Sequence, residues 1–288
     1  MPRSSRLWVA IAAATLVLSG TAHAQEDRRV VIGTPTTHAA AEVGVPILVT
    51  GLSIAPTTVA ITATELTFDG GATWVTAEVL RDHDPSRVDW RYVHTPTAAG
   101  DVEVAGRVVT ASGAGPTGAP VVVHVGGAAV TQPVNCATRC ELGTYYKDAV
   151  DDPDREPVEV GTRFQVDRPG QLLGASLGRG AYRGPISLRL WSETGVLLAE
   201  QPWDHPGLMA QIDFPTPVPV EPGHDYVISY YTPQGGYATS EDFFTGTLVR
   251  APFIAPPGAG VYHYGVGGGF PTESWHDSTY WVLPEFRG

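Results

Sequence analysis

The sequence predicts an all-β protein made of two successive sandwiches. Apolar residues do not recur at helical spacing over a dozen positions anywhere after the N-terminal segment. Short stretches rich in Val, Ile, Thr, Tyr and Trp are separated instead by turn residues, and the 288 residues include 33 Gly and 25 Pro. Glycine permits positive φ and proline fixes φ, so both suit a fold with many turns. We expect an immunoglobulin-like sandwich followed by a jelly-roll-like antiparallel β-sandwich.

Residues 1–24 have the pattern of a secretory signal peptide. Arg3 and Arg6 precede an apolar run, and a small-x-small cleavage site ends at Ala24. The run is shorter than the roughly 20 apolar residues that span a bilayer, so a retained membrane anchor is the weaker alternative. Cleavage would remove two arginines and change the net charge from −12 to −14. We therefore expect a secreted protein, extracellular or associated with the cell envelope, with no membrane span after cleavage.

The charge of the chain argues against nucleic acid as a partner. Its 30 acidic residues outnumber its 18 Lys and Arg residues, and an acidic chain repels a phosphate backbone. No cluster of basic residues interleaved with aromatic residues is present in the sequence. The class of nucleic-acid-binding proteins is therefore excluded.

Residues 30–126 form the first predicted domain. Seven strands are expected, at 46–51, 58–64, 65–69, 73–80, 87–95, 101–110 and 119–125. Leu66 and Phe68 alternate into a D-G-G turn, and Trp74 starts the return strand of a hairpin. Trp74, Trp90 and Tyr92 are expected in the core between two sheets.

The hairpin FDGGATW, followed by VDWRYVHTPTAAGDVEVAGRVVTASG, resembles bacterial immunoglobulin-like modules with a D-G-G-x-T-W hairpin. The resemblance covers nearly all of residues 30–126. It implies a module that serves as a spacer or as a packing partner for a neighbouring domain. The residues of this segment indicate no chemistry of their own.

Residues 127–140 form a linker that contains the only two cysteines, Cys136 and Cys140. In an exported protein such a pair most simply forms a disulfide. A metal site would need further cysteine ligands, and a redox pair would need the C-x-x-C spacing. We expect a local disulfide at the domain junction, which stabilises the fold by about 2 kcal/mol because the loop is short.

Residues 141–288 form the second predicted domain. Eight strands are expected, at 159–167, 171–177, 186–192, 196–203, 210–215, 225–232, 260–265 and 279–286. Strand alternation places Tyr226, Ile228 and Tyr230 on one face, which we predict to be the core face. By the same alternation Tyr280 and Trp281 must point to opposite sides.

Four ordered motifs of this domain resemble the domain of unknown function 4082: VEVGTRFQVDRPGQLLGASL, LRLWSETGVLLAEQPW, IDFPTPVPVEPGHDYVISYYTPQGGYA and GVYHYGVGGGFPTESWHDSTYWV. The resemblance implies a β-sandwich accessory module of undetermined activity, at the end of secreted multi-domain proteins. The chain departs from the family at 176–179, 183–185, 208–210 and Leu283, where relatives carry aromatic-Lys, His, Trp-Gln and Asp. A ligand site formed by those residues would be largely lost here.

The segment GASLG matches the G-x-S-x-G pattern of serine hydrolases at Ser176. A nucleophile elbow needs a strand, a sharp turn and a helix above a parallel sheet. The residues after Ser176, LGRGAYRGP, contain three glycines and a proline, which exclude a stable helix. We interpret the match as coincidence, and we predict no catalytic residue and no enzyme.

Two loops, 232–244 and 267–279, combine glycine with aromatic and amide side chains. Aromatic rings can stack on the C–H faces of sugars, while amides and carboxylates bond their hydroxyls. The simpler interpretation is that these aromatic residues anchor the loops on the sandwich. The binding hypothesis names six ligand-binding residues: Tyr231, Gln234, Tyr237, Trp275, His276 and Asp277.

The stretch KDAVDDPDREP supplies four carboxylates that could bind calcium: Asp148, Asp151, Asp152 and Asp154. Calcium prefers several oxygen ligands from a turning loop. The stretch lacks the glycine and the ordered ligand positions of an EF-hand, so a solvated acidic loop is the simpler alternative. Structural calcium is the one cofactor that the sequence leaves open.

The sequence thus predicts a secreted, non-catalytic accessory protein that binds through loops of its C-terminal sandwich. Its expected partner is a polysaccharide, a cell-envelope glycan or another envelope component. The alternative is a structural module that packs against another protein and binds no small molecule. An enzyme is the weakest of the three hypotheses.

Overall fold

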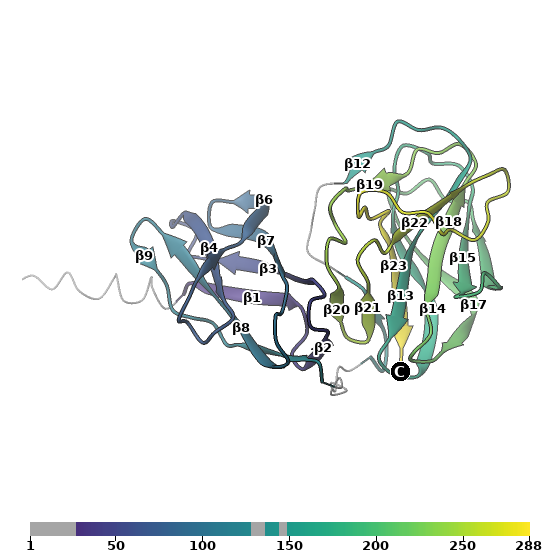
Figure 1. Cartoon of the computed structure of the whole chain (residues 1–288). Coiled ribbons are helices and arrows are strands. Elements are labelled where there is room, and N and C mark those ends of the chain that lie inside the picture. The colour runs from purple at the N-terminus through teal and green to yellow at the C-terminus, as the bar shows by residue number, and fades with distance from the viewer. Residues whose placement is uncertain (1–26, 128–135, 144–148) are drawn as a thin grey trace, which may run out of the picture.

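The computed structural model describes residues 27–127, 136–143 and 149–288. These residues form 23 strands and no helix, arranged as two sandwiches beside each other (Figure 1). The prediction of an all-β fold is confirmed. Within the described part of the chain, no helix is long and apolar enough to cross a membrane.

The first domain packs a four-stranded sheet against a six-stranded sheet. The four-stranded sheet has the order Arg29–Thr34 (β1), Ile47–Ile54 (β3), Arg87–His94 (β7) and Glu78–Asp84 (β6). The second sheet has the order Ala39–Ala41 (β2), Val121–Val125 (β10), Gly100–Thr110 (β8), Ile61–Thr67 (β4) and Val75–Thr76 (β5), and Gly113–Ala114 (β9) pairs with β8. Leu66, Trp90 and Val104 are fully buried between the sheets.

The predicted return strand at 73–80 is divided between the two sheets. Strand β5 pairs with β4 in one sheet, and β6 pairs with β7 in the other. Between them Ala77 is buried, and its amide donates to the carbonyl of Thr64 at 2.9 Å. The chain crosses between sheets at this small residue, which the alternation pattern alone did not reveal.

The D-G-G hairpin is held by the side chain of Asp69. Its carboxylate accepts hydrogen bonds from the Thr67 hydroxyl (2.8 Å) and from the amide (2.9 Å) and hydroxyl (2.6 Å) of Thr73. These bonds, those from Thr73 first, lower the pKa of Asp69 to about 2. Trp74 was expected in the core, but it is half-buried and lies 3.8 Å from the guanidinium of Arg107.

The second domain is a sandwich of a four-stranded and a seven-stranded sheet, with a two-stranded ribbon at one end. The smaller sheet has the order Cys140–Glu141 (β11), Val282–Arg287 (β23), Gly170–Gly178 (β14) and Met209–Val220 (β17). The larger has the order Leu197–Trp203 (β16), Ile186–Ser192 (β15), Tyr226–Thr232 (β18), Val158–Val166 (β13), Phe253–Ala255 (β21) and Leu248–Arg250 (β20), and Gly260–Tyr264 (β22) also pairs with β13. The ribbon consists of Val150–Asp151 (β12) and Ala238–Thr239 (β19).

Strand β18 is buried on both faces. Tyr226, Ile228 and Tyr230 lie in the main core, as predicted from alternation. On the opposite face Val227 packs in a second cluster, against which Phe270 of the loop after β22 also packs. The larger sheet is therefore covered on its outer face by this loop.

Ser176 lies in the middle of β14, which is hydrogen-bonded to β17 on one side and β23 on the other. Its hydroxyl lies 2.7 Å from Glu285 Oε1 and 3.0 Å from Glu141 Oε2, and it donates its one hydrogen to this pair of carboxylates. Gly174 has a φ of 156° at a bulge where both ladders shift register, and a Cβ there would clash with the backbone of Ile212. The GASLG segment is thus a bulged central strand.

Strand β20, at the edge of the larger sheet, meets the first domain (Figure 1). The amide of Thr247 donates to the carbonyl of Pro46 at 2.9 Å, and the amide of Leu48 donates to the carbonyl of Thr247 at 3.0 Å. The amide of Thr36 donates to the carbonyl of Val249 at 3.0 Å. Leu48, fully buried, belongs to the core cluster of the second domain. The two domains are therefore joined by main-chain hydrogen bonds and shared apolar packing.

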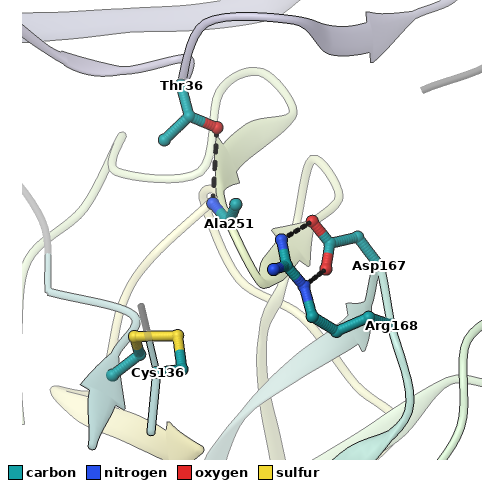
Figure 2. The surroundings of a disulfide bond; sticks show 6 residues. Thr36, Cys136, Asp167, Arg168 and Ala251 are labelled. Carbon is teal, nitrogen blue, oxygen red and sulfur yellow. Dashed lines mark hydrogen bonds and ion pairs between the residues drawn. A yellow bond between two sulfur atoms is a disulfide. The ribbon is translucent and has the colours of Figure 1, made fainter. Parts of the chain in front are cut away.

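The predicted disulfide between Cys136 and Cys140 is confirmed. Cys136 is fully buried, and its carbonyl accepts a hydrogen bond from the amide of Gly288 at 3.2 Å. Cys140 begins β11, which pairs with the C-terminal strand β23. Figure 2 shows the disulfide near the junction, where the amide of Ala251 donates to the hydroxyl of Thr36 at 3.4 Å. The disulfide ties the end of the linker to the last strand of the chain.

Candidate functional site

The ribbon of β12 and β19 separates two pockets of the second domain; it lies near the top of Figure 1. Asp152 lines one pocket, while its neighbour Asp151 lines the other. Tyr280 and Trp281 divide in the same way, as alternation predicted. Because adjacent residues line different pockets, a single layer of chain forms the wall between them.

The first of these, which we call the acidic pocket, has a volume of about 340 Å³. It is lined by five aromatic residues: Tyr237, Tyr262, Tyr264, Trp275 and Tyr280. Tyr237 and Tyr280 are buried and meet edge to face at 5.6 Å, and Tyr262 meets Tyr264 in the same way at 5.6 Å. Tyr264 and Trp275 are 46% and 54% exposed. The pocket thus has a fixed aromatic floor and two accessible rings.

Three carboxylates, those of Asp152, Asp154 and Glu241, also line the acidic pocket. The hydroxyl of Tyr264 donates to Asp154 Oδ2 at 2.6 Å. Burial opposes the charge of Asp154, but the hydrogen bonds from Tyr264 and two backbone amides outweigh it and lower its pKa. Burial, followed by the bond to Asp154, raises the pKa of Tyr264 to about 12. Asp154 is therefore ionised at neutral pH and orients the ring of Tyr264.

Trp275 is carried by a loop with an unusual backbone. His276 and Asp277 have φ values of 45° and 47°, in the left-handed region that residues other than glycine rarely adopt. The carbonyl of Asp277 accepts hydrogen bonds from the amides of Phe243 (2.9 Å) and Phe244 (2.7 Å). The His276 ring stacks on Trp275 with centroids 4.2 Å apart. The 242–244 segment and the stacked imidazole thus hold the indole in place.

The second pocket, which we call the apolar pocket, has a volume of about 730 Å³. Its apolar wall includes Val150, Leu208, Met209, Trp281 and Leu283. Val150, Leu208 and Met209 are 62%, 64% and 74% exposed. These three side chains leave an apolar surface open to solvent, in contrast to the polar rim of the acidic pocket.

The sequence of this domain matches one protein family. Residues 145–282 fit the model described as Domain of unknown function (DUF4082). The second domain is a DUF4082 domain. This confirms the resemblance drawn from its four motifs, whereas the assignment of the first domain to immunoglobulin-like modules stays a prediction. No curated protein matches the chain in sequence.

Several solved structures match the chain at low similarity. The CbhA fibronectin(III)-like modules of Clostridium thermocellum are 18% identical, over 33% of this chain and 93% of theirs, with a TM-score of 0.26. A structure of carbohydrate-binding modules from the β-sandwich superfamily is 11% identical, over 83% of this chain and 99% of that one, with a TM-score of 0.24. The Bacteroides ovatus protein SGBP-B, in complex with a mixed-linkage heptasaccharide, is 11% identical over 68% and 51%, with a TM-score of 0.23. At this level none of them identifies a ligand for the chain.

The DUF4082 domain brings together two of the six residues predicted to bind a ligand. Tyr237 and Trp275 both line the acidic pocket. His276 lies behind Trp275, and its Nδ1 is 3.2 Å from Glu241 Oε2. Asp277 contributes its carbonyl to the loop rather than a side chain to the pocket. These two neighbours of Trp275 therefore support the indole instead of lining the pocket.

Tyr231 and Gln234 lie apart from the acidic pocket. Tyr231 lines a separate hollow with Trp203, and its hydroxyl accepts a hydrogen bond from the amide of Gly267 at 3.0 Å. Gln234 is exposed in the turn after β18. The sequence did not indicate that Tyr262, Tyr264 and Tyr280 join the site.

The predicted calcium ligands do not converge among the described residues. Asp151 and Asp152 line different pockets, and Asp148 lies outside the described residues. Asp152 Oδ1 accepts a hydrogen bond from the amide of Asp154 at 2.8 Å, and Asp151 lies 3.3 Å from the guanidinium of Arg155. The described part of the chain contains no group of three or more His, Cys, Asp or Glu residues that could hold a metal ion. The calcium site stays a prediction.

A buried ion pair anchors the loop that leads to Trp275. Glu159 is fully buried and accepts hydrogen bonds from the Ser229 hydroxyl (2.6 Å) and from Arg189 Nη1 (2.6 Å). Arg189 Nη1 also donates to the carbonyl of Gly267 at 3.0 Å. Burial raises the pKa of Glu159 to about 7, although Ser229 and Arg189 oppose the shift. The charge state of this carboxyl is therefore linked to the contact that holds the loop.

Each of the four segments expected from the sequence to depart from the DUF4082 pattern contributes at least one residue to the apolar pocket. Gly178 and Arg179 come from the first departing segment, Arg183 from the second, Leu208 and Met209 from the third, and Leu283 is the fourth. The acidic pocket contains none of these positions. The expected departures therefore fall on the lining of one pocket and not on that of the other.

Proposed function

We propose that the DUF4082 domain binds a neutral carbohydrate chain in the acidic pocket, without catalysis. One observation supports this proposal above the others: two exposed aromatic rings and three carboxylates line the same hollow of about 340 Å³. The exposed rings are Trp275 and Tyr264, and the carboxylates are Asp152, Asp154 and Glu241.

The chemistry of these groups matches a sugar. The C–H face of a pyranose ring packs on an indole or a phenol, and its hydroxyls donate hydrogen bonds to carboxylates. His276 covers one face of Trp275, so the other face of the indole is the one offered to a ligand. No Lys or Arg is among the described residues that line this pocket. An uncharged glycan is therefore favoured over a uronate or a sulfated glycan, which three carboxylates would repel.

The state of Asp154 supports binding rather than turnover. Glycoside hydrolysis needs one carboxyl that stays protonated at working pH to act as a general acid. The bonds from Tyr264 and backbone amides instead lower the pKa of Asp154 and keep it ionised. An ionised, oriented carboxylate is suited to accept hydrogen bonds from sugar hydroxyls.

The proposal includes a location outside the cell. The N-terminal signal pattern and the disulfide between Cys136 and Cys140 both suit an oxidising compartment. Polysaccharides and envelope glycans are the ligands available there.

The test is a binding assay with the full mature chain. Pull-down with insoluble cellulose, xylan and galactan, together with a glycan array, would identify the sugar, and titration calorimetry would give its affinity. Trp275→Ala should weaken binding at least about fivefold, because an indole stacked on a ligand contributes on the order of 1–3 kcal/mol. Trp275 is 54% exposed, so this variant should fold.

The matched control is Trp74→Ala, which removes a half-buried indole in the first domain. This variant should bind the glycan as the wild type does. A folded wild-type protein that binds no sugar on either platform would refute the proposal. If it formed a stable protein complex in native extracts, a packing function would take its place.

A further inference from the structure

The apolar pocket combines a hydrocarbon-like wall with a polar floor. Met209 is the first residue of β17, and Leu208 precedes it. Trp281 and Leu283 stand on either side of Val282, the first residue of β23. Its volume of about 730 Å³ lies in the range of small-molecule sites. Leu208 and Met209 are 64% and 74% exposed, so the pocket presents apolar side-chain surface to water. A ligand with an apolar body would cover it.

Three arginines line this pocket, and they are not equivalent. Arg179 is buried, and its guanidinium donates to the carbonyls of His205 (2.6 Å) and Gly184 (2.7 Å). Arg183 donates to the carbonyl of Gly180. Both therefore hold the backbone of the loop after β14, although each keeps its positive charge.

Arg250 differs from the other two arginines. Its backbone pairs with Phe253 in the β20–β21 ladder, but its guanidinium makes no hydrogen bond or ion pair with the described residues, and it lines the pocket from β20. Burial lowers its pKa, and the nearby carboxylate of Glu141 acts in the opposite direction. The Glu141 carboxylate and the Glu285 carboxylate both face the Ser176 hydroxyl, so Glu141 already accepts part of a hydrogen bond from a group other than Arg250. The guanidinium of Arg250 thus has donors to offer to a ligand.

We propose that the apolar pocket binds a small amphipathic monocarboxylate, with its carboxylate on Arg250 and its hydrocarbon body against Leu208, Met209, Trp281 and Leu283. Guanidinium pairs with carboxylate in a planar, bidentate geometry, which suits a single buried head group. This site is independent of the glycan site proposed above and would stand if that proposal failed.

The charge of the lining favours a monoanion over a dianion. Three arginines face two acids, Glu141 and Asp151, so the pocket carries one net positive charge within a chain of net charge −12. One carboxylate neutralises this excess, whereas a phosphate monoester would leave an uncompensated negative charge beside Glu141. A cationic amphiphile would be repelled by the three guanidinium groups.

The experiment uses decanoate as the probe, with the mature chain and titration calorimetry. Decanol, decyl phosphate and decyltrimethylammonium test the head group. Decanoate should bind at least about tenfold more tightly than the other three, because charge pairing with an Arg contributes most when the pair is shielded from water. Quenching of Trp281 fluorescence, measured against Trp281→Phe, places the probe in this pocket.

Two variants make the result specific. Arg250→Gln should weaken decanoate binding about tenfold and leave decanol binding within about twofold, because only the charged head loses its partner. Leu208→Glu places a negative charge on the exposed rim and should also weaken decanoate binding; its control, Val196→Glu, changes a similarly exposed residue (57%) on another hairpin and should not. Since Leu208 is exposed, this variant tests the site even if Arg250→Gln fails to fold.

Four results would overturn the proposal. The first is no decanoate binding to the folded protein, and the second is decanoate and decanol binding with equal affinity. The third is tighter binding of decyl phosphate than of decanoate. The last is decanoate binding that neither Arg250→Gln nor Leu208→Glu weakens.

Discussion

The acidic pocket and the apolar pocket share the β12–β19 ribbon as a wall, but they present opposite chemistry. On one side three carboxylates stand among aromatic rings, and on the other three arginines stand among aliphatic side chains. Adjacent residues such as Asp151 and Asp152 contribute to different sides. The comparison shows that one short extended segment can line two pockets of different charge, because successive side chains point in opposite directions.

The largest expected effect concerns Glu159, whose ion pair anchors the loop of the acidic pocket only. Its folded pKa of about 7 is above the ordinary value of 4.5, so the folded state binds the proton more tightly. This contribution to stability is complete below pH 4.5 and is lost as the pH rises through 7. Relative to Glu159→Gln, the wild type should lose about 3 kcal/mol of unfolding free energy across this window. Urea unfolding of both proteins from pH 4.5 to 8 measures the difference.

Ligand binding to the wild type and to Glu159→Gln also compares the two pockets. In Glu159→Gln, decanoate binding at pH 7 should match the wild type, since the apolar pocket does not contact the 265–270 loop. Parallel pH profiles of the two proteins would contradict the raised pKa.

The second effect concerns the disulfide, which lies closer to the apolar pocket. Replacing both Cys136 and Cys140 by Ser should lower the unfolding free energy by about 2 kcal/mol, because the closed loop is short. Glu141, next to Cys140, lines the apolar pocket, so decanoate binding should weaken while glycan binding is retained. Calorimetric titration with each ligand, well below the melting temperature, separates the two sites. Equal losses at both pockets would show that the disulfide acts on the whole domain.

The third effect concerns the charge of the acidic pocket. Glu241→Gln should raise the affinity for polygalacturonate about fivefold and change the affinity for neutral galactan by less than about twofold, because one repulsive charge is removed near the surface. Affinity electrophoresis at low ionic strength would measure both. Glu193→Gln, at an exposed acid near His224, is the control. An unchanged ratio of the two affinities would show that charge does not select the ligand.

The smallest effect crosses the domain boundary. Arg91 of the first domain donates to the carbonyl of Asp242, beside Glu241 in the acidic pocket. Arg91→Ala should therefore weaken glycan binding about threefold, with decanoate binding unchanged, because a single side-chain hydrogen bond contributes about 1 kcal/mol or less. Arg107→Ala, which removes an ion pair with Glu65 within the first domain, should leave both affinities unchanged. If Arg107→Ala weakened glycan binding more than Arg91→Ala did, the hydrogen bond from Arg91 would not be what holds the 241–242 segment for binding.

Local patterns predicted much of this fold. Alternation in DYVISYY placed Tyr226, Ile228 and Tyr230 in the core, and four ordered motifs identified the DUF4082 domain. The glycine-rich residues after Ser176 correctly indicated a strand rather than a nucleophile elbow. These features depend on side-chain period and turn chemistry, which neighbouring residues determine.

Features that depend on distant segments were not predictable from the sequence. Strands β20 and β21 have three residues each and are defined by their neighbours, which include the first domain. The acidic pocket gathers Asp152, Tyr237, Tyr262 and Trp275 from four segments, and the loops pointed to only two of them. The first-domain return strand changes sheets at Ala77, where no glycine or proline marks a break. Tertiary pairing decided each of these cases.

The seam between the domains has a consequence for how this DUF4082 domain can be produced alone. Cutting the chain after the linker would leave the backbone groups of Thr247 and Val249 without hydrogen-bond partners at the exposed edge of the sheet. It would also remove Leu48 from the core of the second domain. An uncovered margin of this kind recruits other chains and promotes aggregation. Recombinant fragments should therefore begin before Arg29, or carry polar substitutions at 247–250, if they are to stay monodisperse.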